Sequence, residues 1–514
     1  MADGLRAGGR HMTGLGSGRA RGTARARQAG EEVRLLTGWG RAGWTAATVA
    51  VPADGAEAEK AVRRTAETGG TILPRGLGRS YGDAAQNAGG TVVDLTRCDR
   101  IVSFDAAGGL LRAEAGLSIG ALLRWSIPRG WFVPVTPGTR HVTLGGALAA
   151  DVHGKNHHRD GSFARFVRSF RIAAPAGTAE ITPEGDPDAF WATAGGMGLT
   201  GVVIEVTLEL IPIETAFMSV DTERAPDIGT CMEMLARGDG RYRYSVAWVD
   251  CLHRSRRGTL GRSVLTRANH AGEDDLSQSG VKVADPLAFS PREVVRLPLA
   301  PPARLVSRTG AALFNELWYR RAPRRREGEI QPVGTYFHPL DAVGSWNLAY
   351  GPPGFTQYQF VVPNGSEDVV GRAVSLLADR RMPSLLAVLK RFGPGDPSPL
   401  AFPAPGWTLA LDLPLGIEGL SRLLDEIDVM VADAGGRVYL AKDSRLRPGL
   451  VERMYPRLDE WRSVRRRMDP GGVLVSDLGR RLGLCGAPQP SAGRAAAAGA
   501  GAAAGAGALA GSQR

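Results

Sequence analysis

The 514-residue sequence lacks several features that mark large classes of protein. Its four cysteines are scattered, and no two of them have the CxxC spacing of zinc ribbons or iron–sulfur proteins. A dense disulfide framework is excluded for the same reason. No run of about 20 strongly apolar residues occurs, so the sequence predicts no transmembrane helix. The first arginines are not followed by an apolar segment, which is unlike a secretion signal.

Lysine is also scarce, with five residues among the 63 that are basic. The five are Lys60, Lys155, Lys282, Lys390 and Lys442. Arginine serves as the cation almost everywhere else, although the two side chains are not interchangeable, because lysine carries a compact ammonium group whose pKa shifts readily. We therefore expect the remaining lysines to include positions where that ammonium group matters for function.

The formal charge of +11 first indicates a nucleic acid or an anionic membrane as the partner. Most of this charge, however, belongs to the ends of the chain. Residues 1–30 carry +5 and residues 486–514 carry +2, which leaves +4 for the 455 residues between them. We interpret residues 1–30 as a disordered basic tail and residues 486–514 as a disordered Ala/Gly tail. We expect no nucleic-acid partner.

Short helices and strands alternate in the N-terminal part of the chain. The pattern predicts helices over residues 55–68 and 117–129, and strands over residues 71–74, 91–95, 110–115 and, much later, 437–441. Longer polar and proline-rich stretches begin near residue 215. Together these patterns predict an α+β protein of two domains. The first domain takes residues 31–215 and 436–485, and the second takes residues 216–435.

A glycine-rich loop follows the predicted strand at residues 71–74. It reads Pro74-Arg-Gly-Leu-Gly-Arg-Ser-Tyr-Gly-Asp83. Glycines at these positions let backbone N–H groups turn toward an anion such as a pyrophosphate. The spacing G-x-G-x-x-x-G differs from the Rossmann fingerprint, and no helix with a ribose-binding acid follows. A tight surface turn is the plain alternative for this loop taken alone.

Two further segments stand out, residues 137–158 and residues 190–208. In the first, small residues at 145–150 let the backbone lie against a flat ligand, and five polar side chains follow between His153 and His158. No acid or cysteine completes a clear ligand set with these histidines, so we expect no metal site; a solvated polar turn is the alternative. The second segment, a glycine-rich turn before an alternating strand, indicates an ordinary connection by itself.

The order of these three segments resembles the FAD-binding domain of the vanillyl-alcohol-oxidase/cresol-methylhydroxylase superfamily. The sequence is similar in particular to the decaprenylphosphoryl-β-D-ribose 2′-oxidase family, over about residues 35–484. The motifs that carry this resemblance are RGLGRSYGD (75–83), PGTRHVTLGG (137–146), DVHGKNHH (151–158), FWATAGGMGLTG (190–201), YGPPGFTQYQF (350–360), KRFGP (390–394) and AKDSR (441–445).

The resemblance implies the fold and the cofactor. The fold would be the two-domain α+β FAD-binding fold of the vanillyl-alcohol-oxidase type, with a substrate domain built on an antiparallel sheet. Arg79 stands where some superfamily members have a histidine bonded covalently to the flavin, so we expect non-covalent FAD. The residues implied to bind FAD are Pro74, Arg75, Gly76, Leu77, Gly78, Arg79, Ser80, Tyr81, Gly82, Asp83, Ala84, Gly138, Thr143, Leu144, Gly145, Gly146, Ala150, Asp151, Val152, His153, Val203 and Tyr439.

The resemblance also implies an activity. It is the FAD-dependent oxidation of the 2′-hydroxyl of polyprenyl-phosphoryl-β-D-ribose to a 2′-keto sugar, the first half of an epimerisation that makes the arabinose donor for cell-wall arabinan. An NAD-dependent reductase would complete the reaction. The lipid substrate implies peripheral contact with a membrane surface, on its cytoplasmic or periplasmic side. The alternative is another sugar or alditol oxidase of the same fold that acts on a soluble substrate.

The resemblance assigns roles to individual residues. We expect a catalytic site made of Lys442, Tyr81, His153 and Lys155. We expect substrate contacts from Gln357, Gln359, Lys390, Trp248 and Phe337. Lys442 is the candidate base, because a desolvated lysine near other cations has a lowered pKa; the alternative is that it only holds Asp443 or a carbonyl group. Gln357 and Gln359 alternate with aromatic residues, so both amides face one way on a strand, as they would on a solvated sheet face.

Overall fold

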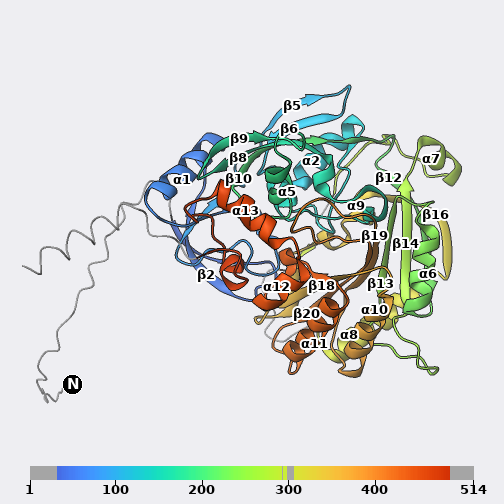
Figure 1. Ribbon diagram of the computed structural model, residues 1–514. Helices are drawn as coiled ribbons and strands as arrows, with labels where there is room; N and C mark the ends of the chain where they lie inside the picture. Colours follow the sequence, from blue (N-terminus) through green and yellow to red (C-terminus); the bar gives the residue numbers. More distant parts are fainter. Residues whose placement is uncertain (1–31, 292, 298–305, 487–514) are drawn as a thin grey trace, which may run out of the picture.

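The computed structural model describes residues 32–291, 293–297 and 306–486 (Figure 1). The two predicted tails, residues 1–30 and 486–514, lie outside the described residues except for Gly486. The described chain mixes helices with antiparallel and parallel strands, which confirms the predicted α+β fold.

The N-terminal part of the chain forms a four-stranded sheet and a five-stranded sheet. The smaller sheet has the order β1 (Glu32–Thr37), β2 (Trp44–Ala50), β4 (Thr91–Asp94), β3 (Ile72–Arg75), and β4 runs parallel to both of its neighbours. The larger sheet is antiparallel, with the order β5 (Ile101–Asp105), β6 (Leu110–Glu114), β10 (Val202–Glu209), β8 (Val167–Ala174), β9 (Gly177–Ile181). The predicted strands at 71–74, 91–95 and 110–115 are confirmed within one residue at their ends.

Helices cover these two sheets. The predicted helix at 55–68 is α1 (Gly55–Glu67), which begins where Asp54 accepts a hydrogen bond from the Glu57 N–H and ends before Gly69, whose φ is +65°. The predicted helix at 117–129 is α2 (Ile119–Ser126) continued by a 3₁₀ turn, Ile127–Arg129. The other short elements of this part are β7 (Trp131–Phe132), α3 (Leu144–Ala149), α4 (His157–Asp160), a 3₁₀ turn (Phe163–Phe166), α5 (Pro187–Thr193) and β11 (Ile211–Pro212).

From Phe217 onward the chain builds an eight-stranded antiparallel sheet. Its order is β16 (Arg325–Pro332), β12 (Phe217–Ala225), β14 (Ser263–His270), β13 (Tyr244–Val249), β19 (Ala387–Phe392), β20 (Gly406–Pro414), β18 (Phe355–Pro363), β21 (Arg437–Val438). In Figure 1 the larger helices of this part lie along the outer side of the sheet. They are α6 (Ile228–Gly238), α8 (Arg308–Arg321), α10 (Glu367–Asp379) and α11 (Leu420–Asp433).

Shorter elements connect the strands of the large sheet. They are α7 (Glu273–Ser279), β15 (Val295–Arg296), α9 (Val333–Phe337), β17 (Val343–Gly344) and two 3₁₀ turns, Pro339–Ala342 and Trp346–Tyr350. The central strands β18 and β20 are buried along almost their whole length, which explains their continuous apolar character. The predicted domain limits at residues 215 and 435 stay a prediction.

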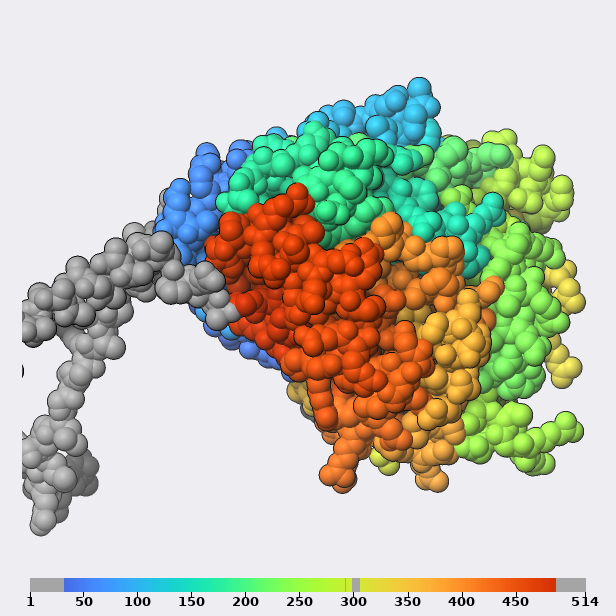
Figure 2. Space-filling model, in the orientation of Figure 1, coloured from blue at the N-terminus to red at the C-terminus, as the bar shows by residue number. Residues whose placement is uncertain are grey.

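After β21 the chain returns to the N-terminal sheets, as the contact of red with blue and green atoms shows in Figure 2. The returning elements are α12 (Pro448–Met454), α13 (Leu458–Met468) and α14 (Asp477–Arg481). The Ile72 N–H donates to the Val473 carbonyl (2.8 Å), and the Val475 N–H donates to the Ile72 carbonyl (3.0 Å). Residues 473–475 thus extend the four-stranded sheet beside β3.

The predicted strand at 437–441 needs a correction, because β21 ends at Val438. The last sheet-like hydrogen bond runs from the Tyr439 N–H to the Gln359 carbonyl (2.9 Å). Leu440–Lys442 then forms a 3₁₀ turn, closed by the Lys442 N–H on the Tyr439 carbonyl (3.0 Å). Lys442 therefore projects from a turn and not from a strand.

Candidate active site

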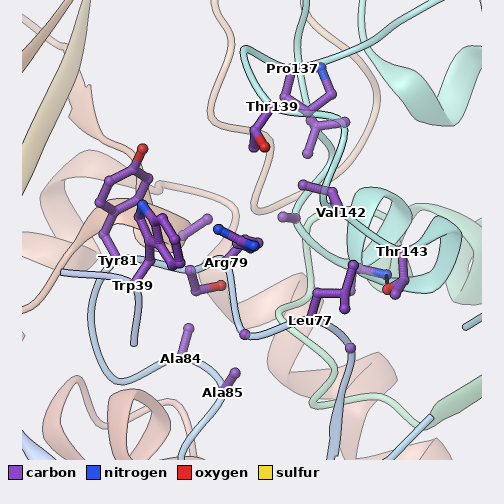
Figure 3. A pocket seen from close by; sticks show the side chains of 18 of the residues that line it. Trp39, Leu77, Arg79, Tyr81, Ala84, Ala85, Pro137, Thr139, Val142 and Thr143 are labelled. Carbon is purple, nitrogen blue, oxygen red and sulfur yellow. Dashed lines mark hydrogen bonds between the residues drawn. The ribbon is translucent and has the colours of Figure 1, made fainter. Parts of the chain in front are cut away.

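A cavity of about 290 Å³ lies between the N-terminal loops and the eight-stranded sheet (Figure 3). One side consists of the glycine-rich loop at 74–85 and the segment at 137–153. The other side consists of β18, β19 and the turn after β21, which supply Gln357, Lys390 and Lys442. Segments that are far apart in the sequence therefore converge on one space.

The glycine-rich loop is fixed in shape by Arg75 at the end of β3. Its guanidinium donates to the Ala85 carbonyl (2.6 Å) and to the Thr37 carbonyl (2.8 Å), so the side chain bridges the base of the loop. Gly78 has φ +62°, which disfavours residues with a side chain. Figure 3 shows that Leu77 and Arg79 from this loop point toward the same cavity as Val142 and Thr143.

The second loop leaves room for a ligand against its backbone. Thr143 begins α3 by accepting a hydrogen bond from the Gly146 N–H (3.2 Å). A Cβ atom built on Gly138 would meet no atom within 4 Å, although Gly138 lines the cavity. A side chain at this position would therefore fill ligand space.

Arg79 is held over an indole ring at the edge of the cavity. Its guanidinium carbon lies 3.8 Å from the ring centre of Trp39, and its Nε has no hydrogen-bond partner in the described residues. Burial lowers the pKa of this guanidinium, against the charge of Asp341. Arginine nevertheless stays charged at neutral pH.

His153 borders the cavity at the end of a chain of oriented hydrogen bonds. The Thr408 hydroxyl donates to the Phe360 carbonyl (2.8 Å), so its oxygen accepts from the Gln359 amide (2.9 Å). This fixes the amide orientation, and the same amide nitrogen faces His153 Nε2 at 3.0 Å. Nε2 is then the acceptor, and Nδ1 carries the proton.

His153 thereby keeps an unused donor in the interior. The residue is 5% exposed, and Nδ1 has no partner among the described residues. Burial, with the charges of Lys390 and Lys442, holds its pKa well below the ordinary value, so the ring stays neutral. A neutral imidazole with a free Nδ1–H at the cavity wall is suited to an acceptor atom on a ligand.

Three of the five lysines gather here, while Lys60 and Lys282 are exposed elsewhere. Lys390 and Lys442 line the cavity. Burial lowers the pKa of Lys442 to about 8, opposed by the charge of Asp412. Burial lowers that of Lys390 to about 7, and the charges of Lys442 and Lys155 lower it further.

Lys155 lies behind this pair and does not border the cavity. Its ammonium group donates to the Tyr336 carbonyl and lies 4.0 Å from the centre of the Tyr336 ring. Burial lowers its pKa to about 7. Its effect on the cavity is therefore electrostatic, through Lys390.

The remaining predicted catalytic and substrate residues divide into two groups. Tyr81 and Gln357 border the cavity, and burial raises the pKa of Tyr81 well above its ordinary value. Gln357 and Gln359 do point to the same side of β18, and both are buried, which excludes a solvated sheet face. Gln359 does not border the cavity, and its amide instead contacts the His153 ring.

Trp248 and Phe337 do not border the cavity. Phe337 packs in an aromatic cluster with Phe132 and Tyr244, at ring-centre distances of 5.2 Å and 4.9 Å. Trp248 donates from its indole nitrogen to the Leu385 carbonyl (3.1 Å). Their predicted role in substrate binding stays a prediction.

Most of the predicted FAD-binding residues line the cavity. Those that do not are Gly82, Asp83, Leu144 and Asp151. Sequence reasoning missed other wall residues, among them Trp39, Thr139, Val142, Met197, Gly198, Leu340, Trp346, Leu386 and Val388. Val388 and Lys390 alternate along β19, and Leu386 continues this period of two just before the strand, which was a signal that could have found both wall residues.

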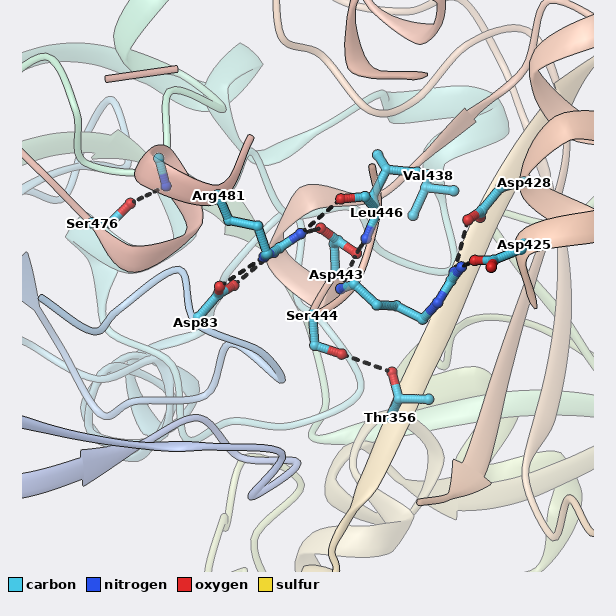
Figure 4. A network of polar contacts seen from close by, with 12 residues as sticks. Asp83, Thr356, Asp425, Asp428, Val438, Asp443, Ser444, Leu446, Ser476 and Arg481 are labelled. Atoms are coloured by element: carbon cyan, nitrogen blue, oxygen red, sulfur yellow. Dashed lines mark hydrogen bonds and ion pairs between the residues drawn. The ribbon is translucent and has the colours of Figure 1, made fainter. Parts of the chain in front are cut away.

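Asp83, in the glycine-rich loop, belongs to an ion-pair network (Figure 4). Arg481 of α14 donates to both Asp83 oxygens, at 2.8 Å and 2.9 Å. The same guanidinium pairs with Asp443 (2.9 Å), the residue after Lys442. A Cβ on Gly82 would lie 1.9 Å from the Asp443 carbonyl oxygen, so only glycine permits this close approach. The network connects the glycine-rich loop directly to the Lys442 turn.

Comparison with known proteins shows the family to which the chain belongs. An FAD binding domain model matches residues 46–182, which contain both loops, and a D-arabinono-1,4-lactone oxidase model matches residues 418–482. The decaprenylphosphoryl-β-D-ribose oxidase of Mycolicibacterium smegmatis is 42% identical over 458 residues, covering 88% of this chain and 98% of that protein. The chain belongs to the decaprenylphosphoryl-β-D-ribose oxidase family.

Two further relatives match most of the chain. An uncharacterized protein of Streptomyces coelicolor is 42% identical over 375 residues, 72% of this chain and all of that protein. The L-gulono-1,4-lactone dehydrogenase of Mycobacterium tuberculosis is 23% identical over 448 residues, 84% of this chain and 94% of that protein. The protein is thus an FAD-dependent oxidoreductase with the two-domain α+β fold of the vanillyl-alcohol-oxidase type.

The residues present fit FAD. The open space at Gly138 and the small residues of both loops leave room for a flat ring system, and His153 presents an unused donor. Within the described ranges, no group of three His, Cys, Asp or Glu side chains is arranged to hold a metal ion. No helix among the same residues is long and apolar enough to cross a bilayer.

Proposed function

We propose that this enzyme uses non-covalent FAD to oxidise the 2′-hydroxyl of polyprenyl-phosphoryl-β-D-ribose to the 2′-keto sugar. The observation that carries the proposal is the pair Lys390 and Lys442, two half-buried lysines in a cavity that is also lined by the two loops of the FAD binding domain match. A sugar phosphate has one group for each of them, the phosphate and the hydroxyl that must lose its proton. The relative from Mycolicibacterium smegmatis is named for a lipid-linked ribose of this kind.

The chemistry divides between cofactor and chain. Bound flavin supplies the capacity to accept a hydride. The protein must take the hydroxyl proton and hold the sugar in one orientation. Lys442, with a pKa near 8, is partly neutral at physiological pH and accepts that proton. Tyr81 and Gln357 border the same space and position the ribose.

Lys390 binds the phosphate of the substrate. Its pKa of about 7 belongs to the cavity without a ligand, where burial and two other lysines disfavour its charge. A phosphodiester next to the ammonium group restores the proton, because an opposite charge raises the pKa of a lysine. Substrate binding therefore takes up a proton near pH 7, and Lys155 adds to the positive potential from behind.

The non-covalent attachment of FAD rests on Arg79. An arginine side chain cannot form the bond that a histidine forms with the flavin in some members of the superfamily. Here Arg79 is stacked on Trp39. Acid precipitation of the holoenzyme is expected to leave all the flavin in the supernatant; flavin that remains with the pellet would contradict this part of the proposal.

We further propose the biological setting that this activity requires. The 2′-keto product needs a reductase to become arabinose, so an NAD-dependent reductase is the expected partner in making the donor for cell-wall arabinan. The substrate carries a polyprenyl chain, so the enzyme works at a membrane surface, on its cytoplasmic or periplasmic side. Enzyme and reductase together are expected to convert the lipid-linked ribose to arabinose, whereas the enzyme alone yields the keto sugar.

The deciding experiment is anaerobic reduction of the purified holoenzyme. Polyprenyl-phosphoryl-ribose should bleach the visible flavin band, and mass spectrometry should find a product two hydrogens lighter than the substrate. The match to a lactone oxidase model at residues 418–482 makes soluble sugars and sugar lactones the proper rivals. Bleaching by a free alditol or a lactone, with none by the lipid-linked ribose, would overturn the proposal.

A further inference from the structure

One helix beside the large sheet exposes bulky apolar side chains. α8 (Arg308–Arg321) buries only Ala311 and Asn315. Four large apolar residues on it are between 43% and 60% exposed: Leu313, Phe314, Leu317 and Trp318. The spacing i, i+1, i+4, i+5 places them on one face of the helix, called here the α8 apolar face. A soluble protein rarely exposes such a group of neighbours unless the surface is used for binding.

The helix is fixed on its narrow buried side. The Asn315 amide donates to Asp250 (2.9 Å) and to the Ser384 carbonyl (3.2 Å). Glu316 accepts from Arg262 (2.6 Å), which also pairs with Asp250. Because these contacts hold the helix in place, the α8 apolar face stays directed outward.

The α8 apolar face adjoins one wall of the cavity described above. Trp318 packs against Trp248 with ring centres 6.5 Å apart, and Trp248 donates to the Leu385 carbonyl. The next residue, Leu386, lines the cavity. A chain leaving the cavity past Leu386 therefore meets the apolar helix.

A second exposed apolar segment reaches the cavity from another element. Val294 is 77% exposed, and Val295 of β15 is 54% exposed. β15 pairs with β17 (Val343–Gly344). Trp346, three residues from Val343, lines the cavity. Exposed apolar residues thus adjoin two different walls of one cavity.

Positive charge accompanies these apolar residues. Residues 251–262 are called here the basic hairpin, which projects at the lower right of Figure 2. The hairpin contacts α8 through the hydrogen bond from Arg262 to Glu316. Arg256 and Arg257 near the hairpin tip are exposed, and neither makes an ion pair within the described part of the chain. A surface that combines apolar side chains with flanking arginines is typical of proteins that bind the headgroup region of an anionic bilayer.

We infer that the α8 apolar face and the basic hairpin rest on an anionic phospholipid bilayer, so that the polyprenyl chain stays in the bilayer while the sugar phosphate enters the cavity past Leu386. This inference rests on the proposed function, because it gives the substrate's lipid chain a place. The apolar residues bury themselves at the headgroup boundary, and the arginines bind lipid phosphates. The docked enzyme then takes its substrate without first extracting the lipid into water.

Vesicle sedimentation of the holoenzyme tests the inference. The probes are vesicles of phosphatidylcholine alone and of phosphatidylcholine with phosphatidylglycerol. We expect binding to the anionic vesicles, and a decrease in affinity of about tenfold or more for Leu313→Ser/Leu317→Ser, because two large apolar side chains no longer enter the bilayer. Arg256→Ser/Arg257→Ser should reduce the preference for anionic vesicles.

A matched control separates this face from apolar exposure in general. Val102 is 53% exposed on β5, which Figure 1 shows at the top of the molecule with α8 at the bottom, so Val102→Ser should bind vesicles like the wild type. Flavin content and thermal unfolding of each variant confirm that it is folded. Wild-type binding by the Leu313→Ser/Leu317→Ser variant would overturn the inference, as would equal losses in the Val102 control.

Kinetics distinguish the failure of this inference from the failure of the proposed function. For Leu313→Ser/Leu317→Ser we expect a higher KM for substrate in vesicles, an unchanged kcat, and unchanged kinetics with a short-chain, water-soluble prenyl-phosphoryl-ribose. If neither substrate reduces the wild-type flavin, the proposed function fails. If the substitutions change only self-association or coupling to the reductase, a protein occupies this face and the inference is wrong.

Discussion

The three interior lysines differ in what surrounds each ammonium group. Lys155 donates to a carbonyl and faces an aromatic ring, whereas Lys442 makes no hydrogen bond from its Nζ within the described residues. Its nearest rings, Tyr81 and Tyr439, are 5.7 Å and 5.9 Å away. A desolvated amine without a local partner is available for a reacting group, as the proposed role of Lys442 as the base requires.

The first prediction concerns Lys442. Lys442→Met should keep FAD and lose about 10²- to 10⁴-fold in the rate of flavin reduction, the usual contribution of a general base. In the wild type this rate should rise with pH through about 8, because the neutral amine is the active form. Stopped-flow reduction across pH 6–10 measures both effects.

Two further variants test the same residue. Lys442→Arg keeps the positive charge but cannot lose its proton, so it should be as slow as Lys442→Met. Lys60→Met, at an exposed lysine on α1, is the control and should behave like the wild type. A Lys442→Met enzyme that keeps the pH dependence of the wild type would show that another group is the base.

The second prediction concerns the chain from Thr408 to His153. Thr408→Val keeps the side-chain shape but removes the oxygen that orients the Gln359 amide. The amide can then turn, and His153 loses its single tautomer. We expect FAD affinity to fall by about tenfold, the value of one hydrogen bond of about 1 kcal/mol with an added desolvation cost. Fluorescence titration of the apoenzyme with FAD measures the affinity.

A variant at a distant threonine provides the comparison. The Thr266 hydroxyl on β14 donates to the Val246 carbonyl, so Thr266→Val removes a similar bond away from the cavity. It should leave FAD affinity unchanged. Nitrogen chemical shifts of labelled His153 should show protonated Nδ1 in the wild-type apoenzyme; protonated Nε2 there would contradict the tautomer assignment.

At the scale of elements, α14 controls the shape of the site from outside it. Arg481 joins Asp83 of the glycine-rich loop to Asp443 of the Lys442 turn. Burial lowers the pKa of Arg481, but the carboxylates of Asp83 and Asp443 together outweigh it and hold the pKa above its ordinary value. One side chain thus sets the distance between the cofactor loop and the proposed base.

The third prediction follows from this connection. Arg481→Met leaves Asp83 and Asp443 close together without their cation, which should destabilise the fold by about 1–3 kcal/mol, less than for a fully buried pair because Arg481 is partly exposed. FAD affinity should fall together with the rate of flavin reduction. Urea unfolding and FAD titration measure these effects.

The control is Arg462→Met on α13, which breaks surface pairs with Glu452 and Asp459. Equal effects of both variants would refute a special role for Arg481.

Local signals in the sequence were sufficient for α1, for the strands β3 and β4, and for the glycine-rich loop, because capping, periodicity and glycine spacing act within a few residues. The length of β21 was not predictable, since its last hydrogen bond depends on Gln359 about 80 residues earlier. Trp39 reaches the cavity only because the glycine-rich loop folds back on it, through the Trp39 N–H and the Ser80 carbonyl. Such wall residues depend on tertiary contacts, which short patterns do not encode.

At the scale of the whole molecule, buried histidines couple stability to pH. His153, His157 and His338 are each at most 5% exposed. Burial lowers the pKa of His157 to about 3 and holds the other two well below the ordinary value. The unfolded chain binds a proton at each histidine below about pH 6.5, and the folded chain does not.

The fourth prediction is therefore a loss of stability in acid. As pH falls from about 6.5 toward 3, each buried histidine should remove up to about 1.4 kcal/mol per pH unit from the free energy of unfolding. Both nitrogens of His157 lack hydrogen-bond partners in the described structure, and its ring packs on Phe392. His157→Phe should make the decline less steep. Urea unfolding at pH 7.5, 6 and 5 tests this, and an unchanged slope would contradict it.

The return of the chain to β3 has a consequence for biosynthesis. The edge of the first sheet is completed by residues 473–475, and the glycine-rich loop is held by Arg481, some 400 residues after that loop has been translated. The ribosome must release nearly the whole chain before the cofactor loops reach their final shape. FAD loading is then a late event that reports on completed synthesis, and chains that stop before α14 should accumulate as apoprotein.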